Sequence, residues 1–348
     1  MTDQPSLPIR YETRPTAIVY GDGEIHELVM AEPSPVMVGA SNLWRRIKTT
    51  IKTGIVLSMV FGYPALMVKA HQIDDTPVAL EVGLPWSAPE AGVSVTLIAR
   101  EVRGTGWAAD RADWRPQAQL VALPAWQSAL ASALSDHAAL SASLAARGGV
   151  ADPDLDMAAR LLRPVADEPM EPRLTAAAEA LSRYDGRKER DLAASVNGHG
   201  ALAAELRLFA DWAEASSIDL ESRMGAAESW PASKDDVSSF YAAKARAHVA
   251  HEILNASARA EPKLMAQAAL RAEVRRVQAH WRRAATQSPL FVYNGGDASF
   301  LLANHLTGMA FVMSEAATAS RELADLLEDA HSEVYVAELS IGRDSTLP

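Results

Sequence analysis

The chain has 348 residues and a net charge of −11, so it lacks the basic balance expected of a dedicated nucleic-acid-binding protein. It contains no cysteine, which excludes disulfides, cysteine metal sites and thiol catalysis. Few aromatic residues (6%) and abundant alanine, the best helix former, predict an all-α protein with one large or two ordinary domains.

Residues 1–43 are proline-rich and show little apolar periodicity. They predict a flexible tail that is too short to be an enzyme or a signalling domain.

The charge-free run from Thr53 to Val68 predicts a transmembrane anchor within residues 44–72. Its helical length of about 24 Å is short of a ~30 Å hydrocarbon core. Lys52 and Lys69 flank the run, and their aliphatic stems can snorkel to the headgroups. The alternatives are a buried helix of a soluble protein and a cleaved signal peptide, for which the preceding region is too long.

Charge on the two sides of this run predicts its orientation. Four cations precede the run, whereas one lysine and two aspartates follow it (Arg45, Arg46, Lys48 and Lys52; Lys69, Asp74 and Asp75). The positive-inside rule places the N-terminus in the cytoplasm. The expected location is a bacterial inner membrane, with the main domain in the periplasm.

Gly54, Ser58 and Gly62 recur every four residues along the expected anchor. Such a small-residue face lets two transmembrane helices pack closely, which predicts a homodimer. The alternative is that small residues are simply common in membrane spans.

Residues 73–124 are expected to form an irregular, partly helical connecting segment, because five prolines interrupt them. The stretch 93–102 fits either a strand or a helix. Trp107, Asp110, Asp113 and Trp114 place two indole faces beside two carboxylates, a combination that suits sugar rings. The alternative is that these tryptophans pin the segment onto the bundle.

From Ala125 onward, apolar residues recur at alternating steps of four and three, which predicts an antiparallel helical bundle over residues 125–332. The expected helices cover residues 125–147, 154–163, 174–184, 202–220, 234–254, 270–284 and 300–327. Gly148-Gly149, Pro164 and Gly186 are expected to end the first three helices, and Ser233 to Asp236 to form a capping box. Residues 333–348 are expected to be a loose tail.

Two clusters on these helices have simpler explanations than a site. His248 and His251 lack a third metal ligand, so packing histidines are expected. Five arginines surround Trp281 and are expected to lie on a solvated face, paired with acidic residues of neighbouring helices (Arg271, Arg275, Arg276, Arg282 and Arg283).

The stretch from Tyr293 to His305 is similar to a nucleotide-cyclase hairpin in its Gly295-Gly296-Asp297 core, which follows Asn294. Ala298 replaces the acidic residue that such a site needs. A turn at the glycines, followed by a helix that Asp297 caps, is the better explanation. An anion site at this helix start is the weaker alternative.

Two motifs in the C-terminal third carry a family resemblance: residues 236–242, and residues 288–296 continuing into 300–305, which end with Asn304 and His305. They resemble an uncharacterised bacterial family catalogued as domain of unknown function 2333. The resemblance implies a single-pass inner-membrane protein with a short cytoplasmic head and a helical periplasmic part, and a helix at residues 93–102. It carries no activity, so it transfers no catalytic residue.

The sequence therefore predicts a membrane-anchored helical protein that acts through protein contacts with other envelope proteins or a second copy of itself. It shows no nucleotide-binding or hydrolase motif, and it predicts no catalytic residue, cofactor, metal or nucleic-acid partner. The alternative is a protein that binds or hydrolyses cell-wall glycan with the segment from Trp107 to Trp114.

Overall fold

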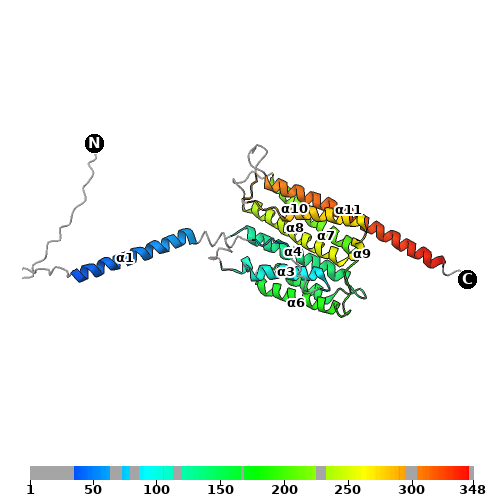
Figure 1. Cartoon of the computed structure of the whole chain (residues 1–348), viewed down its shortest axis with the longest axis horizontal. Coiled ribbons are helices and arrows are strands. Elements are labelled where there is room, and N and C mark those ends of the chain that lie inside the picture. Colours follow the sequence, from blue (N-terminus) through cyan, green and yellow to red (C-terminus); the bar gives the residue numbers. More distant parts are fainter. Residues whose placement is uncertain are drawn as a thin grey trace, which may run out of the picture. The chain divides into compact units, whose positions relative to one another are not determined.

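The computed structural model describes residues 35–62, 73–78, 86–104, 106–112, 120–165, 168–224, 233–289, 291–294 and 304–344. The chain forms two compact units, Met1–Gly62 and Tyr63–Pro348 (Figure 1).

The first unit contains α1 (Pro35–Leu57) and a π-helical turn, η1 (Ser58–Gly62). The helix begins inside the stretch that was predicted to be a flexible tail. None of the described helices combines the length and the apolar content needed to cross a bilayer. Of the run predicted to be a span, residues 63–68 lie outside the described part.

The second unit is an all-α bundle, and its described residues form no strand apart from one isolated bridge between Arg147 and Val150. Its helices are α3 (Pro89–Arg103), the 3-10 turn η2 (Ala108–Asp110), α4 (Ala122–Leu144), α5 (Pro153–Leu162), α6 (Met170–Lys188), α7 (His199–Met224), α8 (Lys234–Ala260), α9 (Pro262–Met265), α10 (Ala268–Ala285) and α11 (His305–Asp344). The prediction of a helical bundle is confirmed, and residues 93–102 are helical.

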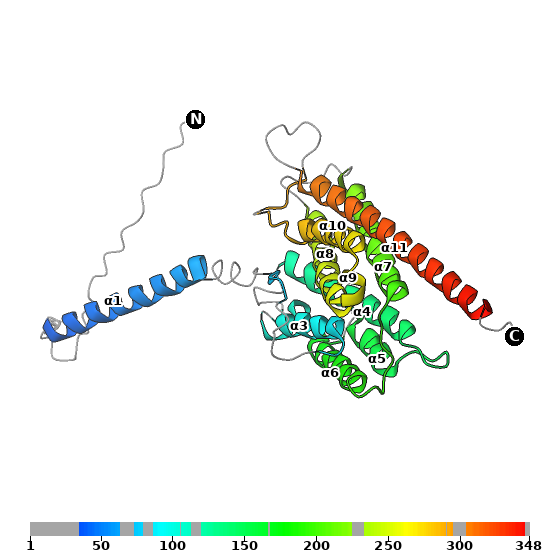
Figure 2. The same cartoon turned by 45° about the vertical axis from the view of Figure 1, so that its right-hand side comes forward.

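Helix α8 lies at the centre of the bundle and packs against α3, α4, α7 and α10 (Figures 1 and 2). Helices α3, α4, α5 and α6 form one side, and α7, α10 and α11 form the other. Helices α7 and α11 are antiparallel, because Arg207 pairs with Asp325 while Thr307 contacts Met224 at the other end.

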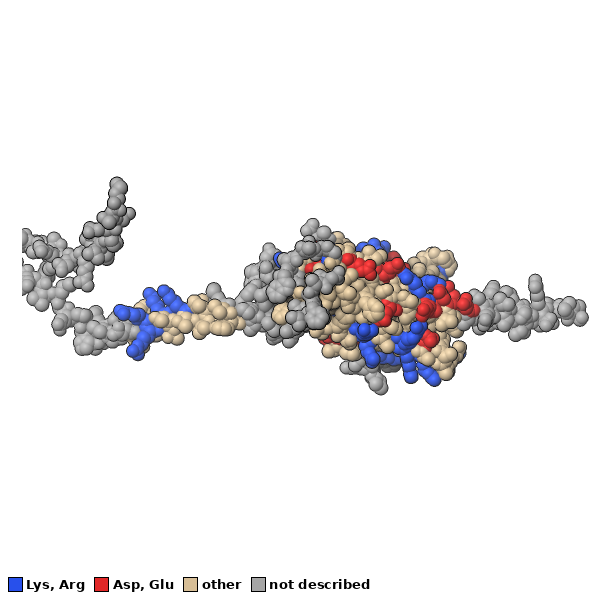
Figure 3. Space-filling view, turned by 90° about the horizontal axis from the view of Figure 1, so that it is seen from above, with Lys and Arg blue, Asp and Glu red and all other residues tan. Residues whose placement is uncertain are grey.

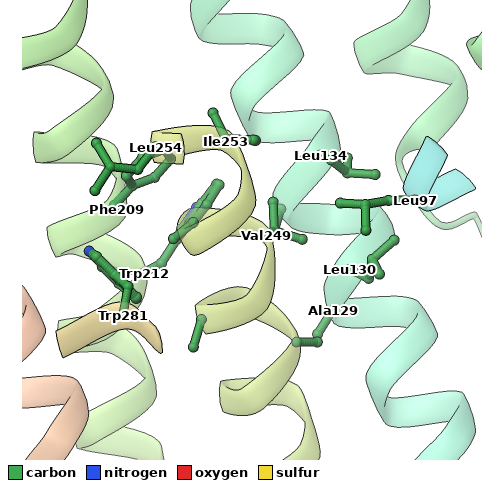
Figure 4. Close-up of a cluster of buried hydrophobic side chains, with 14 of the residues drawn as sticks. Leu97, Ala129, Leu130, Leu134, Phe209, Trp212, Val249, Ile253, Leu254 and Trp281 are labelled. Carbon is green, nitrogen blue, oxygen red and sulfur yellow. The ribbon is translucent and has the colours of Figure 1, made fainter. Parts of the chain in front are cut away.

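The core is continuous across both sides of α8 (Figure 4). Phe209 of α7 and Trp281 of α10 meet edge to face at 6.2 Å between ring centroids, a favoured geometry for aromatic pairs. The indole of Trp281 donates to the hydroxyl of Ser320 at 3.0 Å, which satisfies its buried N–H. Small alanine side chains let α8 approach its neighbours closely, and 16 of its 27 residues are buried.

Several helix ends differ from the sequence prediction, and three of them are instructive. Helix α6 continues past Gly186 to Lys188, and the left-handed residue that follows is Asp191, with φ of 58°. Helix α4 stops at Leu144, and the chain then reverses through Gly148 and Gly149, both with positive φ. Helix α11 runs to Asp344, through the predicted loose tail, because neither glycine nor proline occurs between positions 308 and 342.

Candidate functional site

Trp107 and Asp110, the two predicted ligand residues that the structure describes, lie at η2 beside the start of α6. They line a groove of about 560 Å³, a volume in the range of small-ligand pockets. Its walls are largely apolar and rich in proline (Trp107, Ala109, Asp110, Pro124, Ser128, Pro164, Val165, Glu168, Pro169 and Met170). The other two predicted residues, Asp113 and Trp114, lie outside the described part of the chain.

Asp110 serves as a cap for α6 from outside that helix. Its Oδ2 accepts from the backbone N–H groups of Met170 at 2.7 Å and Glu171 at 2.8 Å. These N–H groups have no partner inside the helix, and the helix dipole favours a negative charge at this end. The carboxylate is therefore held by the fold at the edge of the groove.

Trp107 is only 4% exposed, so its indole packs in the core and touches the groove with little of its surface. Its backbone N–H donates to Glu171 Oε1 at 2.9 Å, and the same oxygen accepts from Arg111 at 2.6 Å. The segment is thus fastened to α6 through both its backbone and its side chains.

A buried polar network under the groove fixes the loop that carries Trp107. Gln127 accepts from the Ala108 N–H at 2.8 Å and donates to the Gly106 carbonyl at 3.0 Å. Glu101 accepts from Gln127 at 2.8 Å and from the Trp126 indole at 2.9 Å. Burial raises the pKa of Glu101 although both hydrogen bonds oppose that shift. Gly106 has φ of 73°, a conformation that favours glycine.

A second polar cluster, which the sequence did not reveal, lies between the two sides of the bundle. His137 Nε2 of α4 lies 3.1 Å from Glu205 Oε1 of α7, and Ser257 of α8 donates to Glu205 Oε2 at 2.8 Å. Glu90 in the first turn of α3 lines the same space as His137 and Glu205. Burial and the charge of Glu205 raise the pKa of Glu90 to about 7, although Lys188 and His137 oppose the shift.

Two small cavities adjoin this cluster, and Glu90, Val196 and Glu205 line both of them. Their volumes are about 20 Å³ and 10 Å³, enough for about one water molecule each and too small for an organic ligand. Within the described ranges, no group of three or more histidine and carboxylate side chains is arranged to hold a metal ion.

A third polar cluster joins α8 to residues 73–78, a segment that we call the strap. The Lys244 ammonium is 2.7 Å from Asp75 Oδ2, and Glu252 Oε2 accepts from the Val78 N–H at 3.1 Å. Arg100 of α3 donates to the carbonyls of Thr76 and Pro77.

His248 and His251 of α8 are packing histidines, as predicted. The ring of His248 lies 5.5 Å from that of Trp126, and His251 is 3.1 Å from the Asn255 amide. Burial lowers the pKa of both imidazoles to about 4. His248 Nε2 and Glu252 Oε1 have no hydrogen-bond partner among the described atoms.

The arginines of α10 lie on its solvent face, also as predicted. Arg276 contacts Glu322 at 2.7 Å and Arg283 contacts Glu315 at 3.1 Å, both across to α11. Figure 3 shows such alternating basic and acidic patches on one face of the bundle.

Of the stretch from Tyr293 to His305, the structure describes residues 293–294 and 304–305, the last of which begins α11. The Asn294 amide donates to the Arg223 carbonyl at 3.1 Å, and Tyr293 exchanges two hydrogen bonds with His305. The described helix begins at His305, and Asn304 Oδ1 caps it by accepting from the N–H groups of Leu306 and Thr307. The sequence assigned this cap to Asp297 and began the helix earlier. Gly295, Gly296 and Asp297 lie outside the described residues.

Gly54, Ser58 and Gly62, the predicted dimer face, lie at the end of α1 and in η1. A Cβ built on Gly54 would meet no atom within 4 Å. The prediction that this face binds a second copy stays a prediction.

Comparison of the chain with protein-family models, with curated proteins and with solved structures gives no match.

Proposed function

We propose that the chain is a single-pass, membrane-anchored helical protein of the bacterial envelope that acts through protein contacts. One observation carries the membrane part. Nine large apolar side chains of the first unit are 41–67% exposed (Leu43, Trp44, Ile47, Ile51, Ile55, Val56, Leu57, Val60 and Phe61). Contiguous apolar surface of this kind marks a membrane or protein contact.

Charge supports the orientation of this anchor. Four cations stand between positions 45 and 52, no acidic residue occurs from Leu43 to Gly62, and Asp74 and Asp75 follow. This asymmetry favours a cytoplasmic N-terminus and a periplasmic bundle at the inner membrane. The resemblance to domain of unknown function 2333 supports the same order of parts.

The bundle is proposed to bind other envelope proteins, with Gly54, Ser58 and Gly62 pairing two copies in the membrane. The hydrogen bonds that Asp110 already makes to α6 support a binding role over a catalytic one. A general acid or base must reach its substrate, whereas this carboxylate accepts hydrogen bonds from the α6 backbone. No catalytic residue or cofactor is proposed.

The groove beside Trp107 favours a second candidate, a protein that binds or cleaves cell-wall glycan. A volume of about 560 Å³ accommodates a sugar-sized ligand. Asp113 would then be the carboxylate that remains for chemistry.

Topology can be measured cleanly because the chain has no cysteine of its own. Ser182→Cys places a thiol on the exposed side of α6, and Ser6→Cys places one in the N-terminal tail. We expect a membrane-impermeant maleimide to label S182C in spheroplasts, and to label S6C only after lysis. Recovery of the full chain in the soluble fraction would disprove the anchor.

The contact role is tested by crosslinking in intact cells followed by identification of the crosslinked proteins. We expect specific envelope partners, and unchanged glycan turnover in Asp113→Ala. Failure to recover a partner, together with altered turnover in D113A, would favour the glycan-acting alternative.

A further inference from the structure

Helix α1 carries its basic and apolar side chains on the same turns. Leu43, Ile47 and Ile51 recur every four residues and share one face. Arg45, Lys48 and Lys52 recur at steps of three and four on the neighbouring face. Beyond Lys52 the described part of the helix has no charge, and Figure 3 shows the basic side chains gathered at one end of its coloured stretch.

Trp44 joins the two faces. The ammonium of Lys48 lies 5.9 Å from the centroid of the Trp44 ring, within the range of a cation–π contact. Both side chains are on exposed turns of the helix. Tryptophan beside lysine and arginine is typical of the boundary between headgroups and acyl chains.

A partner that contacts both faces of α1 must offer negative charge to the basic face and an apolar layer next to it to the apolar face. Nucleic acid offers phosphates but no apolar layer into which Leu43, Ile47 and Ile51 could insert. A bilayer that contains acidic phospholipid offers both, because its phosphates lie directly above the acyl chains. No carboxylate occurs between Leu43 and Gly62, so no acidic side chain of this stretch neutralises the four cations.

We propose that residues 43–52 form an interfacial collar that selects anionic phospholipid headgroups, with Arg45, Arg46, Lys48 and Lys52 contacting the phosphates. This inference rests on the proposed membrane anchor and names the lipid class that surrounds it. Each cation near an anionic bilayer surface strengthens its attraction to that surface.

The test uses the full chain reconstituted in phosphatidylcholine bilayers that contain a spin-labelled lipid. Electron paramagnetic resonance gives the association of labelled phosphatidylglycerol relative to labelled phosphatidylcholine at the protein. We expect a preference for phosphatidylglycerol of at least about fivefold, which one engaged cation supplies. The quadruple variant R45Q/R46Q/K48Q/K52Q should bring this ratio close to one.

A control variant, R271Q/R275Q/R282Q/R283Q, removes the same number of charges from the exposed face of α10. It should keep the preference of the original chain. Equal association of both lipids with the unaltered chain overturns the collar and leaves the anchor intact. Loss of the preference in the α10 variant also overturns it, because net charge would then suffice. Failure to restrict the motion of either lipid would refute the anchor itself.

Discussion

Glu90 links the stability of the bundle to pH. Burial and the nearby Glu205 raise its pKa from 4.5 to about 7. At a pH between these two values, Glu90 is protonated in the folded chain and ionised in the unfolded chain. Stability therefore falls as pH rises from 4.5 to 7, and stays reduced above pH 7. Glu90→Gln removes this loss and should raise the free energy of unfolding at pH 8 by about 2 to 3 kcal/mol.

Urea unfolding of the two proteins at pH 5 and pH 8 measures this difference. Glu179→Gln on the exposed side of α6 is the matched control, and it should leave the pH dependence unchanged. An E90Q protein with the same loss of stability between pH 5 and pH 8 as the original chain would contradict this role of Glu90.

Buried charged residues such as Glu205 and Lys244 could not be predicted from the sequence. The partner of each comes from a distant part of the chain: 68 positions separate His137 from Glu205, and 169 separate Asp75 from Lys244. A charged residue on a helix is expected at the surface unless its partner is known. Nothing in the sequence around His137 points to Glu205 as its partner.

At the scale of single elements, helix α6 depends on a cap from another segment. Asp110→Ala leaves the Met170 and Glu171 N–H groups without their acceptor. We expect a loss of about 1 to 2 kcal/mol in the free energy of unfolding. Asp156→Ala, which removes an exposed pair with Arg160, should cost less than about 1 kcal/mol. Equal losses in D110A and D156A would show that Asp110 does not stabilise α6.

Two residues, Asn304 and Asp297, are candidates for the N-cap of α11. Asn304 accepts two backbone N–H groups at 3.0 and 3.1 Å, so Asn304→Ala should destabilise the protein by about 1 kcal/mol. The sequence pattern pointed to Asp297 because it follows two glycines and precedes an apolar run. Thermal unfolding of N304A and Asp297→Ala distinguishes the two caps. A larger loss of stability in D297A than in N304A would show that the helix begins at Asp297.

Amphipathic helices, which bury one apolar face, were the most predictable elements. In α10 the buried positions are the apolar ones, Val274, Val277 and Trp281 among them, and the arginines take the solvent face. The central position of α8 was not predictable, because a helix surrounded by others has no single apolar face. Its alanines favour a helix in any environment, and only the packed structure shows which of them are buried.

At the scale of the whole molecule, the contacts that hold the strap to the bundle include one nearly inaccessible cation. Lys244 is 1% exposed and pairs with Asp75, whose side chain stays about one-third exposed. Burying an ammonium is costly without a partner, so the pair makes the position of the strap depend on α8. Arg100 and Glu252 hold its backbone from two further directions.

Lys244→Met tests this attachment by replacing the ammonium with an apolar group of similar length. Asp75 then loses its partner but can rehydrate, so we expect a modest loss of about 1 to 2 kcal/mol in unfolding free energy. Hydrogen exchange at the Val78 amide should quicken, because the strap opens more often from α8. Lys234→Met, at the exposed start of the same helix, should change neither quantity. Adding Asp75→Asn to K244M should recover part of the stability; unchanged exchange at Val78 in K244M would mean that the pair does not hold the strap.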